Sequence, residues 1–469
     1  MRQLDVILFG GSGDLATRKL IPALAHIMQN SDLLDHSRLL IAAQDVRDDQ
    51  EFRTAFAARI APHLSETTPE QLDRLMRRMD VLSLDLRAAD GWRSLSDWLS
   101  PTHGRDIIYY FAVPSFLFAS LCRKIRQHNL NPPQSRIVVE KPLGEDLTSA
   151  AEINGVISET FAETQIFRID HYLGKTALQN ILPLRIQNPG LEALWHADSI
   201  DNIQITLAET VGVEGRIELL DRIGTLKDMV QNHMLQIVAL LTMDLPQNLT
   251  ASQIRRGKIK VLQSLRPITE NNILSNMVIG QYRAGTLGGQ TVPGYQEEIS
   301  ASAGTGEMFV ALRIFIDTDR WAGVPVYLRT GKRLRQRCGE IVITFKPRST
   351  SPDANEQPRR VMVEIHPDQN ILSDLPLALH NPLAEGENTR VQDAYEKLLQ
   401  DVIQNDQTFF VHWDEIEASW RWIDQISRAR QKVNIPMQSY APGTSGPISS
   451  HLLPRQDGKY WYSNRVDKE

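Results

Sequence analysis

Residues 5–16, DVILFGGSGDLA, decide the fold of the first part of the chain. Residues 5–9, apolar after Asp5, are typical of a buried strand, and a helical pattern begins at residue 16 and continues to residue 28. Glycines between a strand and a helix let the backbone approach a pyrophosphate, and the helix N-terminus adds free N–H groups. The stretch therefore predicts a dinucleotide-binding turn, although its spacing is not the full GxGxxG and a plain glycine-rich turn is the alternative. The candidate cofactor residues of this turn are Gly10, Gly11, Ser12, Gly13, Asp14 and Leu15.

The end of the second predicted strand, at residues 39–43, bears on the choice of cofactor. Gln44 and Asp45 follow this strand directly. An acidic residue at this point usually bonds the adenine ribose 2′-hydroxyl and repels a 2′-phosphate. Arg47, two residues further on, offers a 2′-phosphate a positive charge instead. The residues themselves favour NAD, and NADP stays open.

Strands and helices alternate along the first third of the chain. Strand patterns at 107–112 and 137–140 alternate with helical patterns at 51–60 and 116–128. Such alternation predicts βαβ units, and the almost continuously apolar strands are typical of a parallel sheet buried on both faces. We therefore expect a Rossmann-type α/β dinucleotide-binding domain over residues 1–170.

The rest of the chain has a different pattern. Residues 203–209, IQITLAE, alternate between apolar and polar side chains, as do later segments at 326–329, 340–345 and 360–365. Alternation predicts a large, mainly antiparallel sheet with one solvated face. Helical patterns at 226–243 and 393–405 are candidates to cover the other face, and 347–358 and 380–390 are predicted loops. We expect an α+β domain over residues 171–469.

Composition excludes several classes of protein. The chain has 469 residues and a net charge of −6, so two or three domains are expected and a nucleic-acid binder with a general basic surface is disfavoured. Its two cysteines, Cys122 and Cys338, provide neither a disulfide framework nor a thiolate metal site. No secretory signal and no apolar run of about 18 residues is present, so we expect a cytoplasmic protein without a membrane partner.

Three segments combine dense polar residues with apolar strands. Residues 138–144, VVEKPLG, place Lys141 at the carboxyl end of a predicted parallel strand, the edge where open α/β sheets bind ligands. Residues 168–175, RIDHYLGK, hold a carboxylate, an imidazole, a phenol and an ammonium, and residues 228–233, DMVQNH, begin a helix with a second imidazole. A lone histidine is more often structural than catalytic, but several such segments in one chain favour an active site.

These segments give the chain its resemblance to the glucose-6-phosphate dehydrogenase family, which extends from Val6 to about Pro447. GGSGDLATRKL resembles the family's cofactor turn, VVEKPLGED its lysine loop and RIDHYLGK its signature, and YLRTGKRL and DAYEKLLQDVIQNDQTFF follow in the family's order. The resemblance implies a Rossmann domain followed by a β+α domain, and a homodimer or homotetramer built through the large sheet. It also implies oxidation of glucose 6-phosphate at C1 with hydride transfer to NADP or NAD.

The resemblance also implies the role of each polar residue. His233 is the expected base, since a histidine's unperturbed pKa of about 6.5 suits proton transfer near neutral pH. Asp170 is expected to orient its imidazole, as a carboxylate does for other catalytic histidines. The expected 6-phosphate ligands are His171, Tyr172, Lys175 and Arg337. The expected partners of the sugar hydroxyls are Lys141, which also lies near the nicotinamide, Lys332, Glu209 and Asp228. For the last two, a helix cap or a strand-end ion pair is the competing interpretation.

The chain departs from the family at a few positions. Gln44 stands where NADP-using relatives commonly have arginine, and Leu219–Leu220 replace an aromatic pair. Glu364 and His366 stand where the family has an arginine and a glutamine that contacts a sugar hydroxyl. A paralogue that oxidises another hexose 6-phosphate is therefore one alternative. A non-catalytic relative that regulates a partner enzyme is the other, and the retained set of polar residues argues against it.

Overall fold

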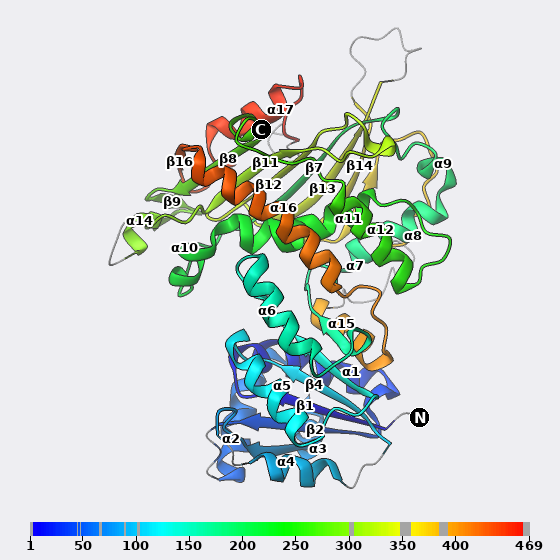
Figure 1. Ribbon diagram of the computed structural model, residues 1–469, viewed down its shortest axis with the longest axis vertical. Coiled ribbons are helices and arrows are strands. Elements are labelled where there is room, and N and C mark those ends of the chain that lie inside the picture. The colour runs from blue at the N-terminus through cyan, green and yellow to red at the C-terminus, as the bar shows by residue number, and fades with distance from the viewer. Residues whose placement is uncertain are drawn as a thin grey trace. The chain divides into compact units, whose positions relative to one another are not determined.

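The computed structural model describes residues 3–44, 46, 48–64, 68–88, 91–100, 104–299, 304–347, 358–383 and 393–462. The chain folds as two compact units (Figure 1). Unit 1 comprises Met1–Gly174, Thr250–Ser252 and Gln392–Trp413, and unit 2 comprises Lys175–Leu249, Gln253–Val391 and Asp414–Glu469. The sequence suggested one boundary after residue 170, whereas two later segments of the chain return to unit 1.

Unit 1 is built on a six-stranded parallel sheet in the order β3-β2-β1-β4-β5-β6. This order and direction confirm the predicted Rossmann-type fold. Its strands are β1 (Leu4–Phe9), β2 (Ser37–Ala43), β3 (Met79–Ser83), β4 (Asp106–Phe111), β5 (Ser135–Val139) and β6 (Ile166–Arg168). Its helices are η1 (Ala16–Leu20), α1 (Ile21–Asn30), η2 (Asp32–Leu34), α2 (Asp49–Ile60), η3 (Ala61–His63), α3 (Pro69–Arg78), α4 (Trp92–Leu99), η5 (Ser115–Leu117), α5 (Phe118–Gln127), α6 (Leu147–Ser158), η6 (Glu163–Gln165) and α15 (Ala394–Gln404).

The central strand β1 shows why this sheet has helices on both faces. Every residue of β1 is buried, and successive side chains point to opposite faces. Val6 and Leu8 belong to one apolar core, while Ile7 and Phe9 belong to another. Each fully buried aliphatic side chain stabilises the fold by about 1.5–3 kcal/mol, so two cores hold the strand that leads into the glycine turn.

Helix α15 lies elsewhere than the sequence suggested. We expected residues 393–405 to cover the large second sheet, but the helix belongs to unit 1. Leu398, Leu399 and Val402 pack into the same core as β1, and Arg136 of β5 donates a 3.1 Å hydrogen bond to the carbonyl oxygen of Val402. The expectation was wrong because an amphipathic pattern identifies an apolar face but not the core that buries it.

Unit 2 contains an eight-stranded sheet in the order β15-β14-β13-β7-β12-β11-β8-β16. Two pairs, β12 with β7 and β16 with β8, are parallel and the others antiparallel, so the predicted mainly antiparallel sheet is confirmed. The strands are β7 (Ile200–Ala208), β8 (Met277–Tyr282), β11 (Phe309–Ile314), β12 (Val326–Gly331), β13 (Cys338–Phe345), β14 (Arg360–His366), β15 (Asn370–Ser373) and β16 (Met437–Tyr440), beside a small hairpin of β9 (Gly285–Leu287) and β10 (Gln290–Val292).

The helices of this part of the chain connect and cover these strands (Figure 1). They are α7 (Thr176–Gln179), α8 (Ile181–Gln187), α9 (Pro189–Glu192), α10 (Ile217–Thr225), η7 (Leu226–Met234), α11 (Leu235–Thr242), α12 (Ala251–Gln263), α13 (Ile273–Asn276), α14 (Tyr295–Glu298), η8 (Asp319–Trp321), α16 (Trp413–Lys432), η10 (Ile448–His451) and α17 (Leu452–Arg455). The predicted helix at 226–243 is confirmed, but its first half, η7, is a π-helix.

Strand β7 lacks the solvated face that its alternating sequence predicted. The polar side chain of Gln204 is only 4% exposed. Its amide donates a 2.9 Å hydrogen bond to the Tyr460 carbonyl oxygen and accepts one of 2.7 Å from the Tyr462 N–H. The expectation was wrong for this strand because a segment more than 250 residues further along the chain covers it.

Most of the predicted loops at 347–358 and 380–390 lie outside the described residues.

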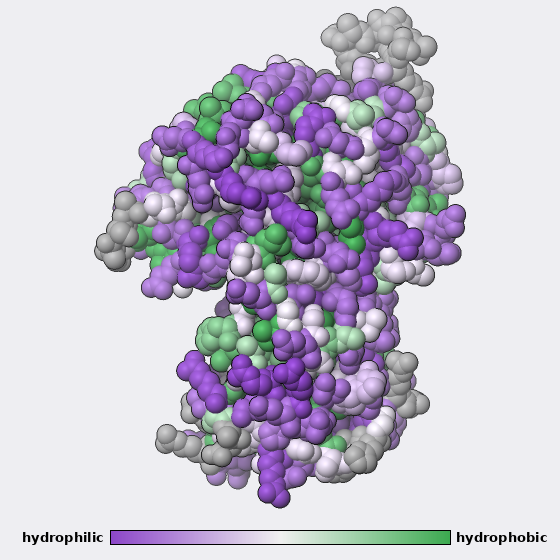
Figure 2. All heavy atoms as spheres, viewed as in Figure 1, coloured by the Kyte–Doolittle hydropathy of each residue, from purple (hydrophilic) through white to green (hydrophobic). Residues whose placement is uncertain are grey.

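Hydrophilic side chains cover much of the face seen in Figure 2. Across the described part of the chain, no helix has the length and apolar composition needed to cross a membrane.

Candidate active site

The glycine turn after β1 needs glycine at two positions. Gly10 has a φ of +73°, and a Cβ atom there would lie 2.5 Å from the Ala112 carbonyl oxygen. A Cβ atom on Gly11 would lie 2.9 Å from the Ile41 side chain. The turn leads directly into η1, so its backbone lies at a helix N-terminus, where anions such as a pyrophosphate bind.

The turn is also tied to the end of β2. The N–H groups of Gly10 and Gly11 both donate to the carbonyl oxygen of Ala42, at 3.1 and 3.3 Å. Gln44 follows β2 and is exposed, two residues beyond this anchor. Asp45 and Arg47, the other two residues expected to contact the 2′ substituent of the adenine ribose, lie outside the described residues.

Two predicted substrate-site residues lie at the carboxyl edge of the same sheet. Lys141 follows β5 by two residues and Asp170 follows β6 by two residues. The strands are in register, and the Ile169 N–H donates a 3.0 Å hydrogen bond to the Val139 carbonyl oxygen. Because carboxyl ends of parallel strands meet at one edge, the structure brings these two residues together in unit 1.

Several residues of the RIDHYLGK segment have contacts that fix its position in unit 1. Arg168 is buried and pairs with Glu163, and a Cβ atom on Gly174 would lie 2.6 Å from the Ala394 carbonyl oxygen of α15. Both therefore hold the segment in place. Asp170 is 4% exposed and accepts a 2.9 Å hydrogen bond from the Tyr172 N–H, which makes a tight turn. That turn presents the rings of His171 and Tyr172, whose centroids are 4.8 Å apart.

In unit 2, Asp228 and His233 share the π-helix η7, and His233 is fully buried. π-Helical turns are rare and occur frequently at functional sites. The helix start is fixed by Glu307, a residue that the sequence interpretation missed. Its Oε1 atom accepts a 3.1 Å hydrogen bond from the Leu226 N–H, and Arg430 donates to Oε2. No local signal links Glu307 to a helix some 80 residues earlier.

Two of the residues expected around the sugar form an ion pair in unit 2. Lys332 is 2% exposed, and its ammonium donates a 2.6 Å hydrogen bond to Glu209 Oε2. Both residues follow the ends of the parallel strands β7 and β12. The ion pair agrees with the interpretation of Glu209 as the partner of a charged residue at a strand end. It also agrees with the expected contact of Glu209 with a sugar hydroxyl.

Two of the expected phosphate ligands in unit 2 lie around His366. Lys175 is the N-cap of α7, Arg337 immediately precedes β13, and His366 ends β14. Burial, together with the positive charges of Lys175 and Arg337, lowers the pKa of the His366 imidazole to about 4. Its ring packs on Gly339, where a Cβ atom would lie 2.7 Å from Nε2. The structure therefore groups two cations and a neutral imidazole.

A second missed residue is Glu140, at the end of β5 beside Lys141. The Tyr110 hydroxyl donates a 2.6 Å hydrogen bond to its Oε1 atom. The pKa of Glu140 is raised to about 7, chiefly by burial. Hydrogen bonds from Tyr110 and Tyr395 and the charge of Lys141 oppose this rise, and the charge of Asp170 adds to it. Its place next to the lysine of the EKP triplet is the one signal that could have identified it.

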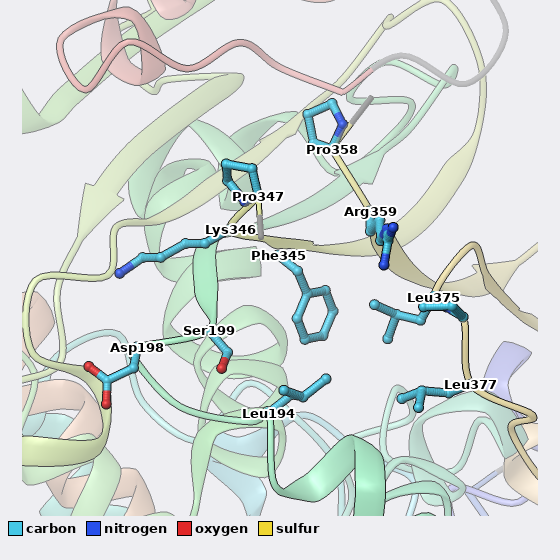
Figure 3. A pocket seen from close by; sticks show the side chains of 11 residues that line it. Leu194, Asp198, Ser199, Phe345, Lys346, Pro347, Pro358, Arg359, Leu375 and Leu377 are labelled. Carbon is cyan, nitrogen blue, oxygen red and sulfur yellow. The ribbon is translucent and has the colours of Figure 1, made fainter. Parts of the chain in front are cut away.

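A pocket of about 200 Å³ lies in unit 2 (Figure 3). Its wall is formed by Phe345, Leu375 and Leu377, and none of the predicted site residues lines it. The Lys346 ammonium at its edge donates a 2.8 Å hydrogen bond to the Ala197 carbonyl oxygen. Asp198, Ser199 and Arg359 also line the pocket, but none of them belongs to the candidate active site.

Comparison with known proteins supplies the family. Residues 7–180 match the glucose-6-phosphate dehydrogenase NAD binding domain, and residues 182–462 match the glucose-6-phosphate dehydrogenase C-terminal domain. The chain belongs to the glucose-6-phosphate dehydrogenase family. It is 40% identical to the glucose-6-phosphate 1-dehydrogenase of Rhizobium meliloti (strain 1021) over 476 residues, or 97% of each chain. The resemblance predicted from the motifs is confirmed, and the protein is an enzyme of an oxidoreductase family.

Solved structures of this family share the whole fold. A glucose-6-phosphate dehydrogenase in complex with its substrate glucose-6-phosphate superposes with a TM-score of 0.87 at 26% identity, over 98% of this chain and 99% of the other. The glucose-6-phosphate 1-dehydrogenase of Mycobacterium avium superposes with a TM-score of 0.82 at 29% identity, over 99% of each chain. Both units are thus part of the common architecture of the family.

Proposed function

We propose that this member of the glucose-6-phosphate dehydrogenase family oxidises glucose 6-phosphate at C1 to 6-phosphogluconolactone, with NAD or NADP as the hydride acceptor. The observation that carries the proposal is the placement of Lys141, Asp170, His171 and Tyr172 at the carboxyl edge of the dinucleotide-binding sheet. This edge is where open α/β sheets bind their ligands. Family membership over the full chain supports the same reaction.

The proposed chemistry needs one base on the protein. His233 takes the proton of the C1 hydroxyl on an imidazole nitrogen, and Asp170 orients that ring and stabilises the imidazolium. As the C1–O bond becomes a carbonyl, the C1–H electron pair leaves as hydride. The dinucleotide, when bound, accepts this hydride. Lys141, Lys332, Glu209 and Asp228 are proposed to hold the sugar hydroxyls.

The 6-phosphate is proposed to bind His171, Tyr172, Lys175 and Arg337. A dianion favours converging charged donors, and arginine can bind it with two parallel N–H groups. His366 stands where the family has glutamine, and it stays neutral at working pH because its pKa is about 4. A neutral imidazole has one N–H donor, so His366 can donate one hydrogen bond where the family's glutamine would donate from its side-chain amide. The same substitution favours the second candidate, a paralogue specific for a different hexose 6-phosphate.

We further propose that NAD is preferred over NADP. Gln44 is exposed at the end of β2 and carries no charge to attract a 2′-phosphate. The acidic side chain of Asp45 suits a free 2′-hydroxyl. The assembly is proposed to be a cytoplasmic homodimer or homotetramer built through the sheet of unit 2, as the family resemblance implies.

A panel of sugar phosphates tests the proposal. Purified enzyme is assayed for reduction of NAD and of NADP with glucose 6-phosphate, other hexose 6-phosphates, hexosamine 6-phosphate and free glucose. We expect glucose 6-phosphate to give the highest kcat/KM, with NAD ahead of NADP. Faster turnover of another hexose 6-phosphate would establish the paralogue instead, and no turnover of any sugar phosphate would contradict the proposed reaction.

A further inference from the structure

His233 lies between two buried glutamines whose side chains contact other helices of unit 2. Gln231 precedes it on η7, and Gln236 follows it on α11. The Gln231 amide donates a 3.1 Å hydrogen bond to the Ser419 hydroxyl of α16. The Gln236 amide oxygen accepts a 3.0 Å hydrogen bond from the buried Lys258 ammonium of α12. The segment that carries His233 is therefore tied to a neighbouring helix on each side of the histidine.

These two contacts are joined to each other through Glu415 of α16, which is fully buried. The Glu415 carboxylate forms an ion pair of 2.7 Å with the Lys258 ammonium. Its backbone carbonyl oxygen accepts a 2.8 Å hydrogen bond from the Ser419 hydroxyl, one turn further along the helix. That hydroxyl therefore donates within α16 and accepts from Gln231. The contacts form a closed polar ring that begins at Gln231 and returns to the next helix at Gln236.

The polar ring supplies a restraint that apolar packing does not. Every residue of α11 is buried, so the hydrophobic effect holds this helix in the core. That effect has no direction, and it permits small sliding or rotation of the helix. Hydrogen bonds require a defined distance and angle, and buried polar contacts whose partners are present select one arrangement of a core. The ring therefore determines the position of the helix more finely than burial alone.

We propose that Lys258 and Glu415 are positioning residues for His233. Their ion pair holds the Lys258 ammonium against the Gln236 amide, which fixes the helix just after His233. The hydrogen bond from Gln231 fixes it just before. Both residues act through the helix that carries the imidazole. The inference rests on the proposed function, because the role of His233 as the base belongs to it.

Removal of both charges at once tests this inference. Lys258→Met alone leaves the buried Glu415 carboxylate without its cation, which destabilises the protein whatever the role of the pair. Lys258→Met combined with Glu415→Leu replaces the pair by apolar side chains of similar volume, a change that is often neutral or stabilising. The double variant should therefore have a midpoint temperature of unfolding close to or above that of the wild type. It lacks the ammonium that holds Gln236.

We expect the double variant to lose about tenfold in kcat, with KM for glucose 6-phosphate within about twofold of the wild type. A displacement of about 1 Å in a catalytic group can cost about 10²-fold, and the apolar packing around the helix keeps the displacement smaller. Gln236→Met leaves the ion pair intact but removes the amide oxygen, and it should lower kcat by about threefold to tenfold. Glu270→Gln is the matched control, because this carboxylate pairs with Lys432 of α16 at the exposed surface, and its kcat should equal the wild type.

The outcomes separate this inference from the proposed function. If the double variant were as stable as the wild type and kept its kcat, the pair would be structural only and the inference wrong, while turnover by the wild type upheld the function. If the double variant did not fold, Gln236→Met would decide: an unchanged kcat would contradict the inference, and a lowered kcat at unchanged KM and unfolding midpoint would support it. If the wild type turned over no hexose 6-phosphate, both the function and the inference would be wrong. A stable double variant with lowered kcat and unchanged KM supports the positioning role.

Discussion

Glu307→Ala should damage catalysis although residue 307 lies outside the set that the family resemblance assigns to substrate or cofactor. The substitution removes the acceptor of the buried Leu226 N–H at the start of the helix that carries Asp228 and His233. An unsatisfied buried N–H costs about 1–3 kcal/mol. The Arg430 side chain is 27% exposed, so loss of its ion pair adds only about 1 kcal/mol or less. The total, about 1–4 kcal/mol, is enough to let the first turn of η7 relax.

Relaxation of the first turn of η7 would displace His233, which lies on the same helix. A displacement of about 1 Å in a catalytic group can reduce the rate about 10²-fold. We therefore expect Glu307→Ala to lower kcat by about 10- to 100-fold, measured with saturating glucose 6-phosphate and cofactor. Thermal unfolding followed by circular dichroism should show a lowered midpoint in the same samples.

Arg430→Ala is the matched control for this prediction. It removes the ion pair but leaves the Glu307 carboxylate free to accept from Leu226, so kcat should fall by less than about fivefold. The reasoning would be refuted if Glu307→Ala kept kcat within about threefold of the wild type. It would also be refuted if Arg430→Ala were as harmful as Glu307→Ala.

Four further predictions concern single sites. His233→Asn should bind sugar phosphate almost normally, as titrated by calorimetry, while kcat falls by about 10²–10⁴-fold; a fall of less than tenfold would remove it as the base. Lys175→Ala should raise KM for glucose 6-phosphate by about one to two decades and leave free glucose almost unaffected; equal losses would contradict the phosphate assignment. The His366 imidazole has a pKa of about 4 in the folded protein and 6.5 when unfolded, so the free energy of unfolding should fall as the pH drops from 6.5 to about 4. In His366→Gln the midpoint temperature of thermal unfolding should fall less over the same pH range. Gln44→Arg with Asp45→Ser should move the kcat/KM ratio towards NADP by about two to three decades, and an unchanged ratio would show that the 2′ position is sensed elsewhere.

The sequence predicted best what is determined locally. The strand, the glycine turn and the helix between residues 4 and 30 are adjacent in the chain, so the local sequence is enough to predict them. Glycine is needed at position 10 because the backbone there has a positive φ. Lys141 and Asp170 could be placed at one sheet edge because parallel strands align their carboxyl ends. The six-stranded sheet agrees with the Rossmann-type fold expected from the alternation of strands and helices.

Long-range packing accounts for what the sequence did not predict. The amphipathic pattern of α15 does not indicate which core buries the helix. The local pattern predicted that Gln204 faces solvent, but residues 460–462, far along the chain, cover this side chain. Glu307 and Glu140 were missed for a related reason. Each acts through groups remote in sequence, Leu226 for Glu307 and Tyr395 for Glu140, and their significance appears only when these groups meet.

Glucose 6-phosphate deuterated at C1 offers the most direct test of the proposed reaction. The enzyme is incubated with this substrate and the oxidised cofactor, and the reduced nicotinamide is recovered and analysed by mass spectrometry. Hydride transfer from C1 predicts that the reduced cofactor carries the deuterium and that kcat falls relative to the unlabelled sugar when chemistry limits the rate. Reduced cofactor without deuterium, or deuterium retained in the sugar product, would contradict oxidation at C1.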